Sequence, residues 1–227
     1  MIERIRIIGS GRVGSAVTAR LQERGVAVVD DDPELVLLCV PDSAIAATAR
    51  SLPSGPWVGH VSGATRLAAL DPHERRFSLH PLQTFTQPAG RGPEQLASQL
   101  DGAWAAITAE SPQALAAARS LAETLGLQPF ELADDQRTLY HAGAVFASNY
   151  LVTVERAASL LIEAAGVPRE ALRPLLQRTV ESGFELTGPV ARGDWATVEA
   201  HRAAIHEAKP ELDVVYDALA EATALLA

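Results

Sequence analysis

The feature that constrains the fold most is a set of three glycines between a predicted strand and a predicted helix near the N-terminus. Ile5–Ile8 is a short apolar run, Gly9–Gly14 follows as Gly-x-Gly-x-x-Gly, and apolar residues from Val13 recur with helical spacing as far as Arg24. In this context the first glycine permits a tight turn, the second lets backbone approach a pyrophosphate, and the third lets helix and strand pack closely. The free N–H groups at the helix start favour an anion.

The sequence therefore predicts a dinucleotide-binding turn, and the alternative is a scaffold that keeps this turn without binding a nucleotide. The predicted cofactor-binding residues of the turn are Gly9, Ser10, Gly11, Arg12, Val13 and Gly14.

Further along, apolar runs of strand length alternate with helical patterns. The runs predict strands at 35–40, 58–61, 77–79, 103–107 and 129–132, and the periodic segments predict helices at 44–52 and 112–125. After that only helices are predicted, at 135–165, 169–186, 194–207 and 211–226. Such a change of pattern indicates two domains. We predict an α/β Rossmann-type parallel sheet at 1–132 and an all-α domain at 133–227.

The predicted sheet is abbreviated after its second strand. Val26–Val29 is an apolar run, and only Asp30–Glu34 separate it from the third run. A parallel crossover takes about a dozen residues or more, whereas five residues reach at most about 18 Å. We therefore expect Val26–Val29 to be a stub or to run in an unusual direction. Asp30 has the spacing of an acid that holds the adenosine ribose, but the short connection leaves that role open.

Composition narrows the classes of function. The 28 acidic and 19 basic residues give a net charge of −9, so we expect neither nucleic acid nor a membrane surface as a partner. No run approaches the roughly 20 apolar residues of a membrane helix. The single cysteine, Cys39, allows no internal disulfide and fits a reducing compartment. We expect a cytoplasmic protein with a small-molecule substrate. No metal is expected, because the remaining histidines lack ligand spacing: His60, His73, His201 and His206.

Three predicted strands end in residues suited to a ligand site. Val40-Pro41, Ser62-Gly63 and His80 each come directly after or at the end of a strand, and the carboxyl ends of parallel strands meet at the edge where ligands bind. We predict that Val40 and Pro41 line the cofactor and that Ser62 lies near both nicotinamide and substrate. The alternative for Ser62 and His80 is an ordinary strand-end turn. The polar segment 83–93 that follows is predicted to be a binding loop or lid.

Seven segments resemble, in the same order, those of a family of bacterial proteins. They are Gly9–Gly14, Leu37–Asp42, His60–Ala64, His80–Phe85, Tyr140–Ala142, Phe146–Asn149 and Leu186–Asp194. The family joins a Rossmann-like domain to a C-terminal domain of unknown function, and its members are described as NAD(P)-dependent oxidoreductases related to 6-phosphogluconate dehydrogenase and pyrroline-5-carboxylate reductase. The resemblance implies a 6-phosphogluconate-dehydrogenase-like helical domain, NADP or NAD as cofactor, and a homodimer through that domain. The chain departs from the family in the short stretch after Val29.

The first long helix of the second domain carries a further polar group. On a regular helical wheel His141, Ser148 and Asn149 lie within about 80° of one another. Related β-hydroxyacid dehydrogenases have a lysine one turn before the asparagine, where this chain has Val145. Hydride transfer to a carbonyl would then need another proton donor, and histidine titrates near neutrality. We predict His141 as that acid and His80 second, with Ser62 and Asn149 as further catalytic residues.

Two classes of function remain open at this stage. The first is an NAD(P)-dependent oxidoreductase that acts on a small, carboxylate-bearing substrate held by Ser148 and Arg192. The second is a non-catalytic binding or regulatory protein that kept the scaffold, which the missing crossover and the missing lysine favour. A third alternative is a structural dimerisation protein. For the polar residues of the long helix, the alternative is tight helix packing.

Overall fold

The chain divides into two compact units in the computed structural model, which describes residues 2–86 and 92–227. The first unit is Met1–Phe146 and the second is Ala147–Ala227. Strands end at Glu131, close to where the sequence predicts the change to helices, but the helical segment up to Phe146 still belongs to the first unit. The division between the two units therefore falls within a long helical run, after Phe146, whereas the predicted boundary is at 132/133.

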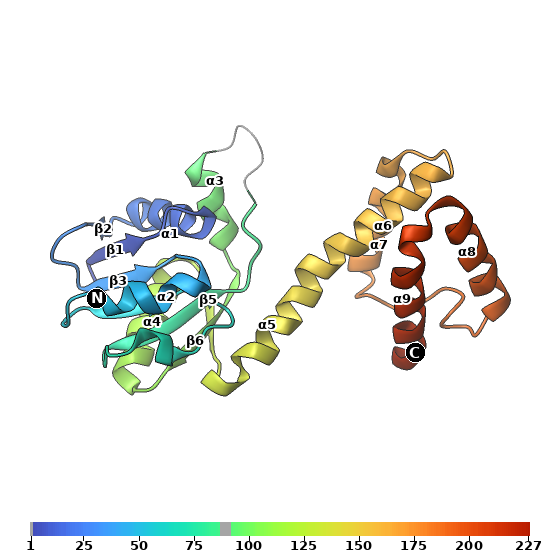
Figure 1. Ribbon diagram of the computed structural model, residues 1–227. Coiled ribbons are helices and arrows are strands. Elements are labelled where there is room, and N and C mark those ends of the chain that lie inside the picture. The colour runs from blue at the N-terminus through green and yellow to red at the C-terminus, as the bar shows by residue number, and fades with distance from the viewer. Residues whose placement is uncertain (1, 87–91) are drawn as a thin grey trace. The chain divides into compact units, whose positions relative to one another are not determined.

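The first unit is built on one seven-stranded sheet within the described residues (Figure 1). Its strands are β1 (Arg4–Ile8), β2 (Ala27–Val28), β3 (Leu35–Leu38), β4 (Trp57–His60), β5 (Arg76–Pro81), β6 (Trp104–Ala109) and β7 (Gln128–Glu131), in the order β2-β1-β3-β4-β5-β6-β7. Neighbouring strands are parallel except β5 and β6, which are antiparallel. The predicted Rossmann-type sheet is confirmed, with one antiparallel pair that the sequence pattern did not indicate.

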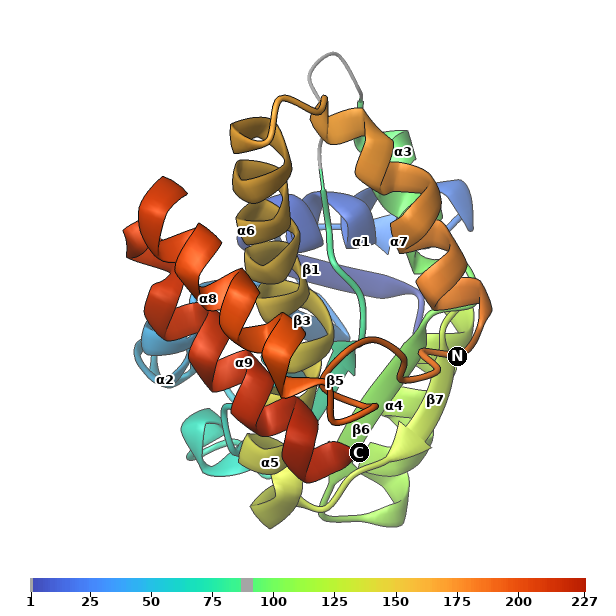
Figure 2. The ribbon, with the colours of Figure 1, turned by 90° about the vertical axis from the view of Figure 1, so that its right-hand side faces the viewer.

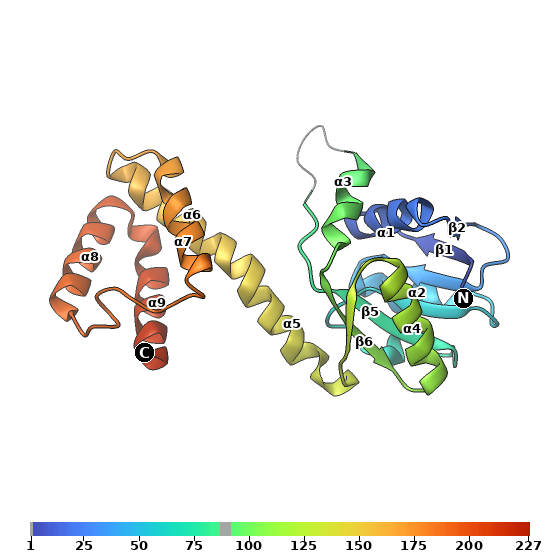
Figure 3. The ribbon, with the colours of Figure 1, turned by 180° about the vertical axis from the view of Figure 1, so that it is seen from behind.

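Helices cover both faces of this sheet, as the continuous apolar strand β3 requires. The described helices of the first unit are α1 (Arg12–Glu23), α2 (Asp42–Arg50), α3 (Pro93–Ala97), α4 (Pro112–Thr124) and α5 (Arg137–Val145), with short 3₁₀ segments η1 (Leu67–Leu70), η2 (Ser98–Leu100) and η3 (Asp134–Gln136). Of these, α1 and α4 pack on one face and α2 on the other, whereas α5 leads away from the sheet (Figure 1). Leu35 and Leu37 of β3 pack in the cluster formed with α1 and α4. Figure 3 shows α4 in front of the sheet. Val36 and Leu38 pack on the other face with α2 and η1.

The register of the strands explains the short connection after β2. β2 pairs only with the first part of β1, where Val28 lies opposite Ile5, and β3 begins on the other side of β1 with Leu35 opposite the same residue. The chain therefore crosses from one side of β1 to the other without travelling back along the sheet. Glu34 receives the N–H of Arg4 at 3.2 Å during this crossing. The predicted short strand at Val26–Val29 is confirmed as the two-residue strand β2, which runs parallel to β1.

The turn that contains Asp30 is held at the amino edge of the sheet. The Arg4 guanidinium donates to the carbonyl of Asp32 at 2.9 Å and pairs with its carboxylate at 3.2 Å. The glycine turn follows the carboxyl end of β1, at the opposite edge. Asp30 itself is exposed in the turn at the amino edge.

The second unit consists of helices, as predicted. They are the π-helical segment η4 (Phe146–Tyr150), shared with the first unit, then α6 (Leu151–Ala164), η5 (Arg169–Ala171), α7 (Leu172–Glu181), α8 (Trp195–Ala208), η6 (Pro210–Leu212) and α9 (Asp213–Leu226). Helices α8 and α9 form a hairpin through η6 (Figure 2).

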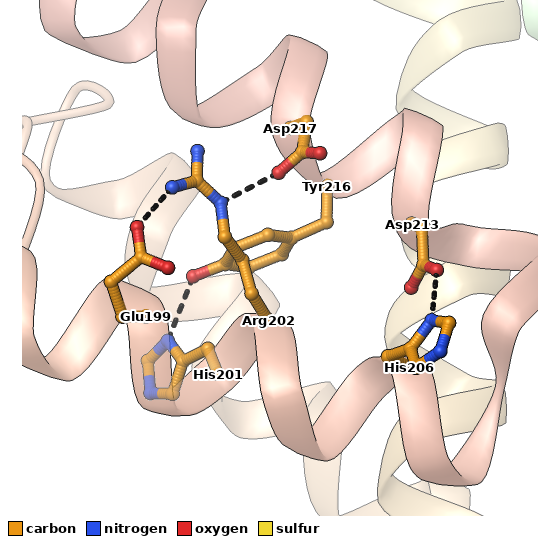
Figure 4. A network of polar contacts seen from close by, with 7 residues as sticks. All are labelled: Glu199, His201, Arg202, His206, Asp213, Tyr216 and Asp217. Carbon is orange, nitrogen blue, oxygen red and sulfur yellow. Dashed lines mark hydrogen bonds and ion pairs between the residues drawn. The ribbon is translucent and has the colours of Figure 1, made fainter.

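Polar contacts join α8 to α9 (Figure 4). Arg202 donates to Asp217 at 2.7 Å, and Nδ1 of His206 lies 2.7 Å from Asp213. Tyr216 and His201 are joined by a hydrogen bond of 2.8 Å. The hairpin is thus fixed by side-chain pairs as well as by apolar packing.

Few apolar side chains are buried in the second unit taken by itself. Leu172, Val198, Ile205 and Ala220 are its buried apolar residues. Many larger ones are exposed, among them Leu175 at 64%, Val180 at 57% and Val214 at 80% of full exposure.

One helical run, Asp134–Ala164, has the length and composition of a membrane-crossing helix, with a mean hydropathy of 1.2 over its most apolar window. The expectation that no stretch approaches that length is wrong here, because successive helical segments join into one run of 31 residues. Only 6% of that window is buried. A single helix of this kind is weak evidence for a membrane, and an exposed apolar surface also marks a protein interface.

Candidate functional site

The three glycines of the β1–α1 turn have three different surroundings. A Cβ built on Gly9 would lie 2.3 Å from the carbonyl oxygen of Cys39, and one built on Gly14 would lie 1.9 Å from the carbonyl oxygen of Gly9. Gly9 also has a φ of +115°, which favours glycine. A Cβ on Gly11 would meet nothing within 4 Å. Gly9 and Gly14 are thus required by the packing of the turn, whereas Gly11 faces open space.

The first turn of α1 offers its N–H groups without a side-chain cap. Gly11 is the N-cap residue, no side chain accepts from the first turn, and no acidic residue lies in it. Such a helix start binds anions because its N–H groups lack partners and carry the positive end of the helix dipole. Arg12, exposed beside the turn, donates to the carbonyl of Phe85 at 3.5 Å. This contact ties the start of the predicted 83–93 loop to the turn; residues 87–91 of that loop lie outside the described residues.

A hollow of about 500 Å³ extends from the glycine turn along α1 towards β2. Its lining includes Ser10, Ser15, Thr18, Gln22 and Val28, and no carboxylate is among the described residues that line it. β2 is the edge strand of the sheet, so no further strand lies beside this hollow in the described residues. The abbreviated stretch thus leaves space next to the turn.

A larger hollow of about 700 Å³ lies at the other edge of the sheet. Glu34, Trp57 and Arg75 are among the residues that line it. Since ligands of open α/β sheets bind at the carboxyl ends of the strands, size alone does not make this amino-edge hollow the candidate site.

Ser62 organises the turn that follows β4. Its hydroxyl lies 2.8 Å from Asp42 and 2.9 Å from the hydroxyl of Thr65, and it accepts the N–H groups of Ala64 and Thr65 at 3.2 and 3.0 Å. Asp42 opens α2 directly after Pro41, which is the N-cap residue of that helix. The side chain of Ser62 therefore joins the ends of β3 and β4 at the carboxyl edge, where the sequence predicts a site.

Two histidines and a tyrosine meet beside Gly63. Nδ1 of His80 lies 2.8 Å from the hydroxyl of Tyr140, and the rings of His80 and His141 are 6.2 Å apart at 76°. A Cβ on Gly63 would lie 2.6 Å from Cδ2 of His141 and 2.9 Å from Nε2 of His80. Only glycine leaves room for both rings, so β4, β5 and α5 converge here. The structure brings together His80 and His141, both predicted from the sequence.

Arg137 is fully buried behind this group. Its guanidinium donates to the carbonyl of Thr65 at 2.7 Å, to the hydroxyl of Thr108 at 2.8 Å and to the carbonyl of Ser62. Burial lowers the pKa of this guanidinium. Neither Arg137 nor Tyr140 was predicted from the sequence as a site residue. Tyr140 stands next to His141 in the segment Tyr140–Ala142, whereas nothing in the sequence distinguishes Arg137 from a surface arginine.

The charge and the burial of this region shift three pKa values. Burial, with the nearby His141 and Arg137, lowers the pKa of His80 to about 4. Burial together with Arg137 and His80 lowers the pKa of His60 to about 3. Burial raises the pKa of Tyr140 to about 12. At neutral pH all three side chains are therefore uncharged.

The predicted residues of the second unit lie on two separate segments. Ser148 and Asn149 are in the π-helical segment η4, where Ser148 is hydrogen-bonded to Asn149 at 3.0 Å. The regular wheel used to group them with His141 does not apply there, because a π-helical turn has a different period. Arg192 is exposed in the turn before α8, and Asp194 caps that helix through the N–H of Thr197 at 3.2 Å. Their grouping with His141 stays a prediction.

No three His, Cys, Asp or Glu side chains of residues 2–86 and 92–227 are arranged to hold a metal ion.

Comparisons with known proteins agree with this fold. A family model described as "Domain of unknown function (DUF2520)" matches residues 103–223. A Bacteroides fragilis protein described as a "putative NADP oxidoreductase" is 19% identical, with a TM-score of 0.82 over 98% of each chain. A protein from Thermotoga maritima is 23% identical, with a TM-score of 0.73 over 97% of this chain and 98% of that one.

A third solved structure is more distant. The reductive aminase from Aspergillus terreus, in complex with NADPH and ethyl levulinate, is 16% identical, with a TM-score of 0.66 over 97% of this chain and 93% of that one. At these identities the solved structures show the fold. No curated protein matches the sequence. The family expected from the sequence motifs is confirmed.

Proposed function

The chain belongs to the DUF2520 family, and we propose that it is an NAD(P)-dependent oxidoreductase acting on a small, carboxylate-bearing substrate. The observation that carries this proposal is the glycine turn. Gly9 and Gly14 are required by its internal packing, while Gly11 faces open space at an uncapped helix start. A turn that served packing alone would have no need of glycine at that middle position.

The residues present fit a dinucleotide. The N–H groups that follow Gly11 would hold the diphosphate, the hollow along α1 would take the adenosine half, and Val40 with Pro41 would line the cofactor after β3. When bound, the cofactor supplies or accepts the hydride. The NADP oxidoreductase description of the Bacteroides fragilis relative and the NADPH in the reductive aminase complex support this choice. The absence of a carboxylate in the described lining of the hollow supports NADP over NAD, whose ribose an acid usually holds.

Three of the proposed catalytic residues, Ser62, His80 and His141, belong to the first unit, and the two histidines lie beside the turn that follows β4. His141 and His80 are the candidate proton donors, Ser62 positions the turn beside them, and Asn149 is a further candidate. Ser148 and Arg192 would bind the substrate carboxylate, because an arginine guanidinium matches a carboxylate with paired hydrogen bonds. His141→Ala is expected to abolish NADPH oxidation with any 2-oxo acid or imine acid that the wild type reduces, while leaving cofactor affinity intact. Unchanged turnover would remove His141 from this role.

Calorimetric titration with NADPH and NADH tests the cofactor directly. We expect NADPH to bind, and Gly11→Ala to weaken it at least tenfold, because the new methyl group would occupy the space through which the diphosphate approaches. The fold should accept this change, since Gly11 has a φ of −69° and the methyl group meets no protein atom within 4 Å. Gly143→Ala, which also adds a methyl group in open space, is the matched control.

Two results would contradict the proposal: no binding of either cofactor at millimolar concentration, or equal affinity of the wild type and Gly11→Ala. The first result would favour the second candidate function, a binding or regulatory protein on the same scaffold. The two-residue strand β2 is the observation behind that candidate, because it shortens the part of the sheet that holds an adenosine.

The proposed assembly is a cytoplasmic homodimer formed through the helical unit. Leu175, Val180 and Val214 are exposed in a unit that buries few apolar side chains by itself, and a second copy would cover such a surface. Sedimentation at micromolar concentration should give the dimer mass. The double change Leu175→Glu with Val180→Glu should give the monomer, whereas Gln177→Glu on the same helix should not. A monomeric wild type would refute the assembly.

A further inference from the structure

We infer that Tyr140, His80 and Arg137 form a proton relay in which His80 passes a proton without becoming charged. Tyr140 gives a proton to Nδ1 of His80 while Nε2 of the same ring releases one to the substrate, and Arg137 stabilises the phenolate that remains. The destination of the proton rests on the proposed function. The arrangement of the three side chains does not.

The direction of the relay follows from the hydrogen bond between Tyr140 and His80. Among the described residues, Nδ1 of His80 is the polar partner of the Tyr140 hydroxyl, at 2.8 Å. A neutral tyrosine has one hydrogen to donate, and a half-buried donor is most stable when it is paired. If Tyr140 donates, Nδ1 is the acceptor and the ring hydrogen must be on Nε2. This atom lies beside Gly63, where an added Cβ would come within 2.9 Å of it.

The charges around His80 explain why a relay is needed. Burial of the ring, with His141 and Arg137 on α5, disfavours its protonated form, and Asp42 on α2 opposes them only in part. His60 on β4 is another uncharged neighbour. Because the pKa of His80 is about 4, an imidazolium ion is scarce at pH 7. A neutral imidazole can release the hydrogen on Nε2 only if Nδ1 gains one at the same time. Tyr140 is placed to supply it.

Arg137 completes the relay as a positioning residue. Its three hydrogen bonds go to uncharged oxygen atoms, those of Ser62, Thr65 and Thr108, so no direct ion pair among the described residues cancels its charge. This positive charge lowers the pKa of Tyr140 while burial raises it. The hydroxyl thus stays protonated at rest, and a transient phenolate has a buried cation near it.

The balance of the step is complete. In the reduction, a bound cofactor would supply the substrate carbon with a hydride and its two electrons. The π pair of the C=O or C=N bond moves to the heteroatom, which takes the hydrogen of His80 Nε2. Nδ1 takes the hydrogen of Tyr140, which leaves the phenolate. After product release a proton from water enters at Nε2 while Nδ1 returns its hydrogen to the phenolate, and this resets the ring. No charge is left on His80 at any point.

Nitrogen NMR of the whole protein labelled with ¹⁵N-histidine tests the resting state of the relay without a substrate. We expect His80, assigned with the variant His80→Gln, to be neutral with its hydrogen on Nε2 from pH 5 to pH 8. Tyr140→Phe, which keeps the ring and removes one oxygen atom, should shift the Nδ1 signal and mix the two tautomers. Tyr216→Phe is the matched control, since it removes the equivalent bond to His201 and should leave His80 unchanged.

An Nδ1–H tautomer in the wild type, a charged His80 at pH 7, or a Tyr140→Phe spectrum with unchanged His80 signals would each overturn the relay. NADPH titration of the same Tyr140→Phe protein separates this outcome from failure of the proposed function. We expect unchanged cofactor affinity, and with any substrate that the wild type reduces a fall in kcat of roughly a hundredfold or more, the usual contribution of positioned proton transfer. Turnover equal to that of the wild type would also overturn the relay.

Discussion

Replacing Gly14 with alanine should destabilise the first unit although alanine is the better helix former. The new Cβ would lie 1.9 Å from the carbonyl oxygen of Gly9 and 3.2 Å from Cβ of Cys39. Both neighbours are backbone or short side chains, so the turn itself must move by about 1 Å to restore contact distance. Overpacking of this kind costs about 1–3 kcal/mol or more, and the gain in helix propensity offsets at most about 1 kcal/mol.

We therefore expect a net loss of about 2 kcal/mol in the free energy of unfolding of the first unit. For a chain of this size that is a fall in Tm of roughly 4–8 °C. Urea and thermal unfolding can be followed by tryptophan fluorescence, because Trp57 and Trp104 belong to this unit. Gly143→Ala, on α5 with open space around it, is the control and should be neutral or slightly stabilising. A Gly14→Ala protein as stable as the wild type would refute the packing described for the turn.

Three further predictions concern stability and charge. His60 and His80 bind protons less tightly in the fold, with pKa values of about 3 and about 4, than in the unfolded chain, where the value is 6.5. The urea-derived free energy of unfolding should therefore fall as the pH drops from about 6.5 to 4, by up to about 1.4 kcal/mol per pH unit for each group, and a flat profile would contradict their burial. Asp213 raises the pKa of His206, so the ion pair stabilises the fold below pH 6.5 and its contribution is lost as the pH rises through the pKa of the folded state. Asp213→Asn should lower the pKa of His206 in an NMR titration. An unchanged pKa would exclude the ion pair. Ser111 caps α4 through the N–H of Ala114 at 3.1 Å, so Ser111→Ala should lower the free energy of unfolding in urea by about 1 kcal/mol; an unchanged value would contradict the cap.

Local patterns predicted most of the fold. The glycine turn, the apolar run that became β3 and the change to helices near residue 132 each depend on neighbours in sequence, which is why periodicity and turn chemistry found them. The antiparallel pairing of β5 with β6 was not found, because pairing direction depends on the path of a loop rather than on the strands. The stub β2 was predicted from chain length, but its position at the amino edge depended on register.

The candidate site was predicted in part for the same reason. His80 and His141 were predicted as candidates because a histidine at the end of a strand, or on a helix of small residues, can serve as a proton donor next to a ligand. Arg137 was missed, since its burial is created by β4, β6 and the turn at Thr65, none of which is near it in sequence. The expected titration of His80 near neutrality also changed, because burial of the ring, together with the charges of His141 and Arg137, lowers its pKa to about 4. Long-range electrostatics leaves no local pattern to detect.

The two-residue strand β2 has a consequence for what the turn could hold. Because so little protein lies beyond β2, the adenosine half of a bound dinucleotide would lie against one helix rather than between two. Most of the binding contacts would then be made to the diphosphate. Removing the adenosine half of the cofactor should therefore weaken its binding less here than in a dehydrogenase with a full six-stranded sheet.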